Sequence, residues 1–438
     1  MRSIRFDRDA SLRAKTLLIA NRGLILGDAT SASWELVCND VLLLTTSDRP
    51  DIVDLPDGRI LVATARGTLE SSDRACNWET LSTFGDMVST PALAQHPTEP
   101  ETLFLSTYAP GMTGLQQSRD GGRTWRELLR VADTDFLRYI RIARSDPARM
   151  YMAKLGFASS KFAYAVMRSA DGGKTWQEQA VELNQNETDL EILGVSPRDP
   201  DLLLAKAHAA DQVLMAERLF VSRDGGKTFE QPIALHTITQ VEWSAVGESL
   251  WLATDDGLYR STDAAHSFER VGKADLISCV QEREGALYAC GWHKGVEAGM
   301  PGIGVSHDQG ETFEHYMNLN EVKLPLACDR TSDASVHCEQ LWIDWQREIL
   351  GYVPMAGRAA TAGTDAAQGG GPAAGAAGQV AGSAGASTAE APKSSSGCSS
   401  LPGSADSGLS FIACLGACLG PRWLGRRLRA RLTARSAR

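Results

Sequence analysis

A short box of eight residues recurs along the whole first part of the chain. Its best copies are Ser118–Trp125, Ser169–Trp176 and Ser222–Phe229. Weaker copies are Ser71–Trp78, Ser261–Phe268 and Ser306–Phe313, and a remnant lies at Gly27–Trp34. The closing aromatic residues are separated by 44, 47, 51, 53, 39 and 45 residues. A repeat of this length predicts similar supersecondary units that bury their faces against one another.

Each repeat carries the pattern of four short strands. Two apolar runs precede the box and flank a turn, as Ile192–Leu193 and Leu202–Leu204 flank Pro197–Pro200. A third run leads into the box (Gly257–Arg260) and a fourth leaves it (Trp125–Leu128). Such runs, with β-branched residues and turn residues between them, are typical of strands. Radial repetition of four-stranded units leaves only short edges. We therefore expect an all-β fold, a seven-bladed β-propeller of four-stranded antiparallel blades, over residues 1–350.

The box has a structural logic of its own. Asp120 can accept hydrogen bonds from backbone N–H groups of its own turn, and Gly122 allows a conformation that a Cβ disfavours. Trp125 would fix the turn between neighbouring blades. Cation binding or catalysis by these aspartates is the alternative, but one box per blade does not converge on one site. We expect the same structural role for Asp73, Asp120, Asp171, Asp224, Asp263 and Asp308.

The box resembles the Asp-box (BNR) motif of sialidases, sortilin-type receptors and photosystem II assembly propellers. The resemblance covers about residues 1–320. Ala75, Ala265 and Ser31 stand where the motif has glycine, so we expect altered box turns there. The sialidase members would imply an arginine triad, a tyrosine nucleophile and an Arg-Ile-Pro string, and the nearest string, Tyr139–Ile142, lacks the proline.

Two classes of function follow. The first is a non-catalytic binding or scaffold propeller for an unknown glycan or protein. For this class we expect no cofactor and no metal. No two histidines stand four residues apart, as they would in a helical zinc motif. The second is an extracellular glycoside hydrolase, for which inner-strand carboxylates would supply the acid and base. Those carboxylates are Asp51, Asp54, Glu191 and Glu242.

The connections between second and third strands vary in length while the boxes do not. Function tends to lie on such loops. The connections are 109–113, 157–162, 206–212 and 293–300. The candidate binding residues that flank or lie in them are Tyr108, Lys154, His208, Trp292 and His293.

Charge argues against nucleic acid as a partner. The formal charge is −10, and residues 422–438 hold seven arginines and no acid, so the other 421 residues carry −17. A body of that charge repels phosphate backbones. We expect a monomer.

The composition changes after the repeats. Residues 351–397 are rich in Gly, Ala and Ser and read as a disordered linker. Residues 398–438 hold Cys398, an apolar run over 409–420 and an arginine-rich end. This order resembles the MYXO-CTERM sorting tail of myxobacterial surface proteins. The resemblance implies that a sorting protease processes the tail, that Cys398 carries lipid, and that the tail meets the membrane. A disordered extension is the alternative.

A sorting tail requires export. Residues 1–20 carry no secretory signal, because charged residues interrupt any apolar core. We expect a signal peptide upstream of an incorrectly assigned start, and localisation at the outer membrane or cell surface. A cytoplasmic propeller is the alternative.

Six cysteines lie in the repeat region, an even number that suits disulfides in an oxidising compartment. Cys279 and Cys290 flank Glu284-Gly285, and a two-residue turn there would place them opposite each other. Cys328 and Cys338 would close a short loop, which leaves Cys38 and Cys76. Buried free thiols are the alternative.

Overall fold

A computed structural model describes 3–6, 15–20, 23–28, 33–44, 50–81, 84, 88–158, 161–210, 217–235, 237–274, 276–291, 302–318, 321–323 and 328–350. The chain divides into two compact units, Met1–Ala359 and Ala360–Arg438. The expected linker and sorting tail, with Cys398 and the apolar run 409–420, lie outside the described residues.

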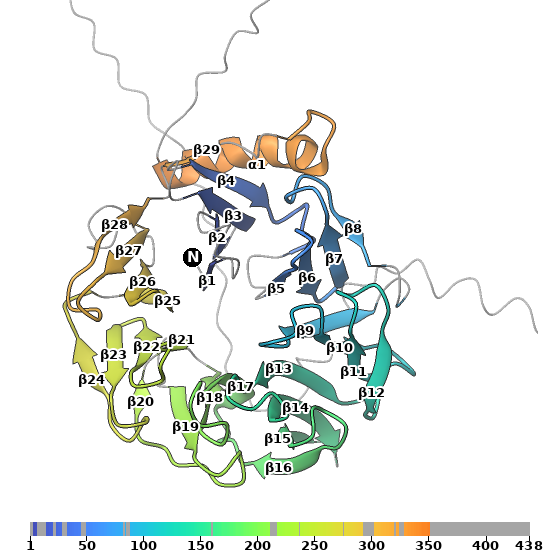
Figure 1. The fold of residues 1–438 in the computed structure, drawn as a ribbon, viewed down its shortest axis with the longest axis vertical. Coiled ribbons are helices and arrows are strands. Elements are labelled where there is room, and N and C mark those ends of the chain that lie inside the picture. The colour runs from blue at the N-terminus through green and yellow to red at the C-terminus, as the bar shows by residue number, and fades with distance from the viewer. Residues whose placement is uncertain are drawn as a thin grey trace, which may run out of the picture. The chain divides into compact units, whose positions relative to one another are not determined.

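Six sheets of the first unit are antiparallel and four-stranded, and each is built from four consecutive strands (Figure 1). The first two sheets are β5 (Asp51–Asp54), β6 (Ile60–Thr64), β7 (Gly67–Ser71), β8 (Glu79–Thr80), and β9 (Ser89–Gln95), β10 (Leu103–Tyr108), β11 (Gly114–Ser118), β12 (Arg126–Arg130). The next two are β13 (Phe136–Ile142), β14 (Met150–Ala158), β15 (Lys161–Ser169), β16 (Gln177–Val181), and β17 (Glu187–Val195), β18 (Leu203–Ala209), β19 (Glu217–Ser222), β20 (Ala234–Leu235). The last two are β21 (Ile238–Trp243), β22 (Leu250–Thr254), β23 (Gly257–Ser261), β24 (Glu269–Val271), and β25 (Ile277–Arg283), β26 (Ala286–Gly291), β27 (Ile303–Ser306), β28 (Glu314–Met317).

A further sheet joins the two ends of the repeat region. It has five strands: β1 (Ser3–Phe6), β2 (Lys15–Ala20), β3 (Gly23–Asp28), β4 (Ser33–Cys38) and β29 (Val322–Lys323). β29 pairs in parallel with β4, with Val322 opposite Trp34. The expectation of seven four-stranded antiparallel blades is therefore corrected: six sheets have that form, and this sheet has five strands with one parallel pair. The physical reason is that β4 offers an open edge, and a strand from the end of the repeats pairs with it.

The hydrophobic core is divided among the junctions between neighbouring sheets. Val53 and Leu61 pack with Leu105 across one junction, and Phe104 packs with Met150 across the next. The first and last strands obey the same rule, because Leu36 of β4 packs with Cys279 and Ile303. Such division is how a repeat protein builds a large core from small units. The all-β propeller with four-stranded antiparallel blades is thus confirmed, and the first strand of each blade lies innermost in Figure 1.

A helix that the sequence reading did not predict follows the last sheet. Helix α1 (Asp333–Leu350) lies along β4 in Figure 1. Ser332 caps it, because its Oγ accepts the backbone N–H of Ser335 at 3.3 Å. Asp333, the first residue of the helix, makes a contact outside it: its carboxylate accepts a hydrogen bond from the backbone N–H of Trp78 at 3.0 Å. The helix is therefore attached to the box turn of the β5–β8 sheet.

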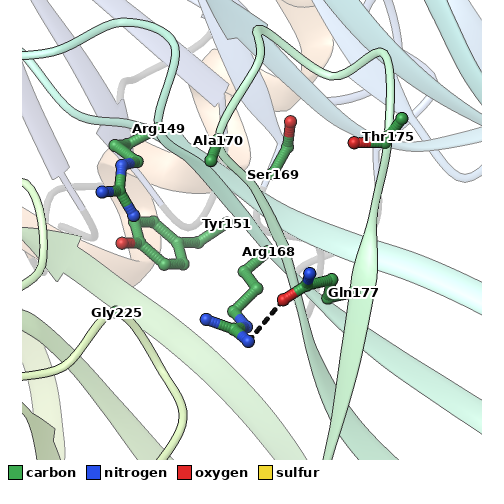
Figure 2. A pocket seen from close by; sticks show the side chains of 8 residues that line it. All are labelled: Arg149, Tyr151, Arg168, Ser169, Ala170, Thr175, Gln177 and Gly225. Atoms are coloured by element: carbon green, nitrogen blue, oxygen red, sulfur yellow. Dashed lines mark hydrogen bonds between the residues drawn. The ribbon is translucent and has the colours of Figure 1, made fainter.

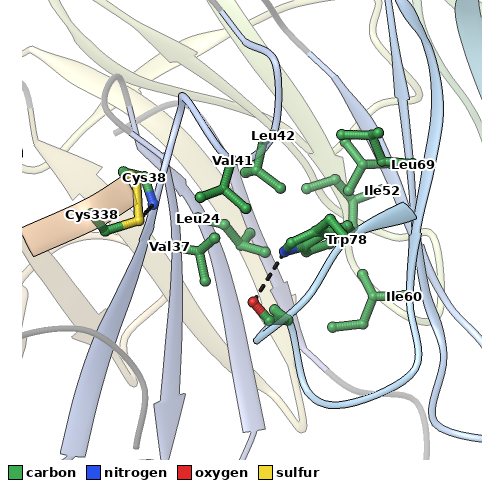
Figure 3. Packing of buried hydrophobic residues seen from close by; sticks show 12 residues of the cluster. Leu24, Val37, Cys38, Val41, Leu42, Ile52, Ile60, Leu69, Trp78 and Cys338 are labelled. Carbon is green, nitrogen blue, oxygen red and sulfur yellow. Dashed lines mark hydrogen bonds between the residues drawn. A yellow bond between two sulfur atoms is a disulfide. The ribbon is translucent and has the colours of Figure 1, made fainter. Parts of the chain in front are cut away.

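Two disulfides fix this helical segment to the start of the repeats. The bridges are Cys38–Cys338 and Cys76–Cys328, with sequence separations of 300 and 252. The expected Cys328–Cys338 bridge is wrong, because each of these cysteines meets a partner that ring closure brings to it. Figure 3 shows the Cys38–Cys338 bridge beside the apolar cluster that contains Leu24 and Trp78.

The third disulfide has the expected form. Cys279 and Cys290 lie opposite each other on β25 and β26, with their Cα atoms 4.9 Å apart. Glu284 and Gly285 both have positive φ, 53° and 83°, as a type I′ hairpin turn requires. The prediction of disulfides among the six cysteines is confirmed, and it suits an oxidising environment. Among the described residues, no helix is long and apolar enough to span a membrane.

Candidate binding face and the Asp-box turns

The six described boxes share one hydrogen-bond pattern. In the β9–β12 sheet, Ser118 Oγ donates to Asp120 Oδ1 at 2.7 Å and the Thr124 N–H donates to the same oxygen at 2.9 Å. Thr124 Oγ1 donates to Oδ2 at 2.5 Å. The aspartates that repeat this arrangement with the residue four positions on are Asp73, Asp171, Asp224, Asp263 and Asp308.

These bonds hold the aspartates in the charged form. Partial burial works to raise the pKa of Asp120, but the hydrogen bonds from Thr124 and Ser118 outweigh it and hold the pKa at about 2. Each carboxylate is occupied by groups of its own turn. The hydrogen bonds of each box therefore stabilise its own turn, and the six carboxylates do not meet at a common site.

Two boxes without the second glycine keep the glycine conformation. Ala75 and Ala265 have φ of 67° and 65°, against 85° for Gly122. Their backbone N–H groups donate to Ser71 Oγ and Ser261 Oγ at 2.9 Å, as in the other boxes. The expectation of altered turns at these alanines is therefore wrong: the hydrogen bonds of the box and the burial of each alanine hold it in a left-handed conformation. Ser31 lies outside the described residues.

Three of the five candidate binding residues lie at one edge of three consecutive sheets. Tyr108 ends β10 and His208 lies next to the end of β18. Lys154 is the middle residue of β14 and lies opposite Leu137, near the start of β13. Because strands alternate in direction, these ends face away from the boxes, which connect third and fourth strands. We call this edge the loop face. Trp292 and His293 lie outside the described residues.

Tyr108 and Lys154 are held by neighbouring groups. The Tyr108 ring stacks on Phe136, with centroids 3.8 Å apart and planes at 22°. Lys154 Nζ lies 3.2 Å from an Asp135 carboxylate oxygen and 2.7 Å from one of Glu178. Burial works to lower the pKa of Lys154, but the two carboxylates outweigh it and raise the pKa. The lysine is thus a charged part of a local network at the loop face.

His208 belongs to a buried charged network that the sequence reading missed. Its Nε2 lies 2.8 Å from a Glu191 oxygen, and its Nδ1 lies 3.4 Å from Glu217 Oε1. Lys206 Nζ lies 3.0 Å from Glu217 Oε2 and donates to the carbonyl of Ile238 on the next sheet. Lys206 is 0% exposed and Glu217 is 1% exposed. A lysine inside the apolar run of β18 was the available signal, since buried charges need partners.

The network shifts the ionisation of its members. Burial works to lower the pKa of His208, but hydrogen bonds to Glu191 and Glu217 outweigh it and raise the pKa. Burial likewise works to raise the pKa of Glu217, but His208 and Lys206 lower it. His208 is therefore chiefly an internal link between β17, β18 and β19, and only its edge reaches the loop face.

The β14–β15 hairpin carries the exposed aromatic residues of this face. Its strands are nine residues each. Phe157 and Phe162 stand opposite each other near its tip, with ring centroids 5.5 Å apart. They are 45% and 56% exposed. Paired phenylalanines exposed on a hairpin do not add to the core, and an exposed apolar patch of this kind indicates a contact surface.

The inner-strand carboxylates mostly join neighbouring sheets. Asp51 accepts the backbone N–H of Leu93 at 3.1 Å, and Glu242 accepts that of Glu282 at 3.3 Å. Burial raises the pKa of Glu242 to about 8, although Arg144 works in the opposite direction. Among the described residues, no group of three or more His, Cys, Asp or Glu side chains is placed to hold a metal ion.

One family model matches the middle of the repeat region. The model of the Sortilin-Vps10 family (sortilin, neurotensin receptor 3) matches residues 113–281. This supports a β-propeller of the sortilin/BNR type. No curated protein matches the chain.

Among solved structures, a xyloglucanase from Xanthomonas campestris aligns with 12% identity and a TM-score of 0.43, over 72% of this chain and 67% of that one. YCF48 from Cyanidioschyzon merolae aligns with 12% identity and a TM-score of 0.42, over 66% and 91%. The extracellular domain of the putative hybrid two component system BT4673 from B. thetaiotaomicron aligns with 16% identity and a TM-score of 0.45, over 69% of this chain and only 37% of that one. With TM-scores below 0.5, these alignments carry no argument about this chain.

Proposed function

We propose that this chain is a non-catalytic binding or scaffold propeller, displayed at the cell surface, that holds a glycan or protein ligand on its loop face. In this proposal the five-stranded sheet serves as the seventh blade and closes the ring. The observation that carries the proposal is the exposed pair Phe157 and Phe162 on the β14–β15 hairpin, on the loop face that also carries Tyr108 and Lys154.

Chemistry supports a contact surface more than a reaction centre. The box aspartates are saturated by their own turns, and Glu191 faces His208. Apolar rings with charged groups nearby suit the faces of sugar rings or a protein surface, because aromatic side chains provide large contact area at small cost in flexibility. The disulfides suit an extracellular setting.

The test is a glycan array and a pull-down from the native host with the full chain, followed by titration of each hit. Phe157→Ala and Phe162→Ala should each weaken binding by about tenfold. The matched control is Val246→Ala, which removes another exposed apolar side chain, 62% exposed, from a different sheet connection. Binding that both phenylalanine variants retain in full would contradict the loop-face assignment.

A glycoside hydrolase is the second candidate, and one observation favours it. Burial raises the pKa of Glu242 to about 8, which favours its protonated form at neutral pH, as a general acid requires. Hydrolysis of any bound glycan that Glu242→Gln abolishes, with unchanged affinity, would establish this function. Glu248→Gln is the control, since that exposed carboxylate lies in the β21–β22 connection.

We also propose that residues 398–438 sort the protein to the surface. The basis is the order of Cys398, apolar run and arginines in the sequence. In the native host, the mature membrane-bound protein should lack Arg426 and Arg427, and Cys398→Ala should abolish surface display. One lipid chain alone binds a membrane only reversibly, so stable display needs at least two. Retention of the arginines in that protein would refute sorting.

A further inference from the structure

A pocket lies on the box side of the chain, at the junction of the β13–β16 and β17–β20 sheets. It contains about 350 Å³ of empty space, part of it open to solvent. Figure 2 shows Arg149 and Arg168 on its wall, with the Tyr151 ring between them. Gln177 and Gly225 complete this side of the wall.

Arg168 has no carboxylate partner at this pocket. One of its terminal nitrogens donates to the neutral Gln177 Oε1 at 2.5 Å. Within the described part of the chain, no carboxylate pairs with this arginine. Its side chain is partly exposed, so its positive charge stands at the pocket wall without an anion to balance it.

A matched position shows that the missing carboxylate partner is not a property of every blade, although the Nε atoms of both arginines are buried without a hydrogen-bond partner. Arg260 precedes the box of the β21–β24 sheet, as Arg168 precedes that of the β13–β16 sheet. Its guanidinium pairs with Glu269 at 2.7 Å and donates to Gln309 at 3.0 Å. The corresponding partner of Arg168 is the neutral Gln177. The charge of Arg260 is therefore compensated by the protein, and that of Arg168 is not.

The other polar groups of the wall are committed. Arg149 pairs with Asp201 at 2.9 Å, and Tyr151 Oη donates to the Pro200 carbonyl at 2.7 Å. Gly225 donates its N–H to the Asp201 carbonyl at 2.9 Å. Its φ is +71°, and an added Cβ would lie 2.7 Å from an Asp201 oxygen. This wall is therefore rigid, and Arg168 is its uncommitted cation.

We propose that this pocket is a binding subsite for an oxyanion, the sulfate or carboxylate group of an acidic ligand, with Arg168 as its principal donor. Planar guanidinium groups bind such anions with two parallel hydrogen bonds. Arg149 adds positive charge at the opposite wall. The subsite is independent of the loop face, because it lies on the box side of the blades.

The experiment titrates the full chain with sodium sulfate and, separately, with sodium acetate, against sodium chloride at equal ionic strength. Calorimetry and the melting temperature are the two readouts. Sulfate or acetate should bind saturably where chloride does not, and Arg168→Gln should weaken that binding by about tenfold or more. Arg260→Gln is the matched control and should leave it unchanged.

The two anions separate the possible sources. Stronger binding of acetate indicates a carboxylate ligand, and stronger binding of sulfate indicates a sulfated one. Arg168→Lys replaces Arg168→Gln in the test if the glutamine variant does not fold. Lysine keeps the positive charge but cannot form two parallel hydrogen bonds from one planar group, so this variant should weaken anion binding as well. Equal effects of Arg168→Gln and Arg260→Gln, or no saturable difference from chloride, would overturn the subsite.

Discussion

Replacement of a box aspartate tests whether the box holds the fold. Asp120→Ala removes the acceptor for Ser118 Oγ, the Thr124 N–H and Thr124 Oγ1. Each such bond contributes about 0.5–1.5 kcal/mol net, but Thr124 is exposed and water replaces part of the loss. We therefore expect the free energy of unfolding to fall by about 1–2 kcal/mol, with any ligand affinity of the folded protein unchanged.

The pH dependence of this loss has a definite sign. The folded pKa of Asp120, about 2, lies below the ordinary value of 3.8. The stabilisation is therefore complete above pH ~5 and is lost as the pH falls toward 2. Urea unfolding followed by tryptophan fluorescence at pH 7 and pH 3 measures it. Glu101→Ala, an exposed carboxylate of the same sheet, is the control. A variant as stable as the wild type at pH 7, or a loss equal at both pH values, would refute the reasoning.

Three further predictions follow from the packing and the networks. Gly173→Ala should lower the free energy of unfolding, measured in urea, by about 1–3 kcal/mol. The reason is that Gly173 has φ of +84° and that an added Cβ would lie 2.7 Å from Leu128 Cδ2. An unchanged urea midpoint would show that this box turn can relax. Cys76→Ser should lower the free energy of unfolding by about 2–5 kcal/mol. Peptide mapping of the wild type without reduction should find Cys76 joined to Cys328. A peptide in which Cys328 is joined to Cys338 would contradict the structure. The stabilisation that His208 provides should be complete below its ordinary pKa of 6.5 and should decline as the pH rises through its raised folded pKa. The loss of stability caused by His208→Gln, measured by urea unfolding, should therefore become smaller as the pH rises above 6.5. A loss that does not change with pH would contradict this assignment of the proton to His208.

The sequence predicts most of this fold because its information is local and repeated. A box such as Ser169–Trp176 carries its own turn chemistry, so the four-stranded sheets follow from spacing and patterning. The Cys279–Cys290 bridge was predictable for the same reason, since a two-residue turn sets its register.

Features that depend on ring closure could not be predicted in this way. The pairing of Cys38 with Cys338 and of β29 with β4 joins segments about 300 residues apart. Local reasoning favoured the nearest cysteine and was wrong. The same holds for the alanines of the box turns, because burial and the hydrogen bonds of the box decide their conformation, and propensity alone does not.

The candidate site was predictable only as a region. Variable loops pointed to the edge that carries Tyr108, Lys154 and His208, and the structure brings these residues to one face of three neighbouring sheets. The sequence could not show that Lys154 is paired with carboxylates or that His208 links a buried network. Phe157 and Phe162 were part of a predicted loop, but their exposure is a property of the folded hairpin.

The most direct test of the proposed function asks whether a bound ligand survives. Purified full-length protein is incubated with each glycan or protein that binds it, at pH 5, 7 and 8, and the ligand is then analysed by mass spectrometry. If the propeller only binds, every ligand is recovered intact. Binding is then about tenfold weaker with Phe157→Ala and unchanged with Asp120→Ala in the protein that remains folded. Turnover of any ligand by wild-type protein, abolished in Glu242→Gln, would contradict a role in binding alone and establish an enzyme.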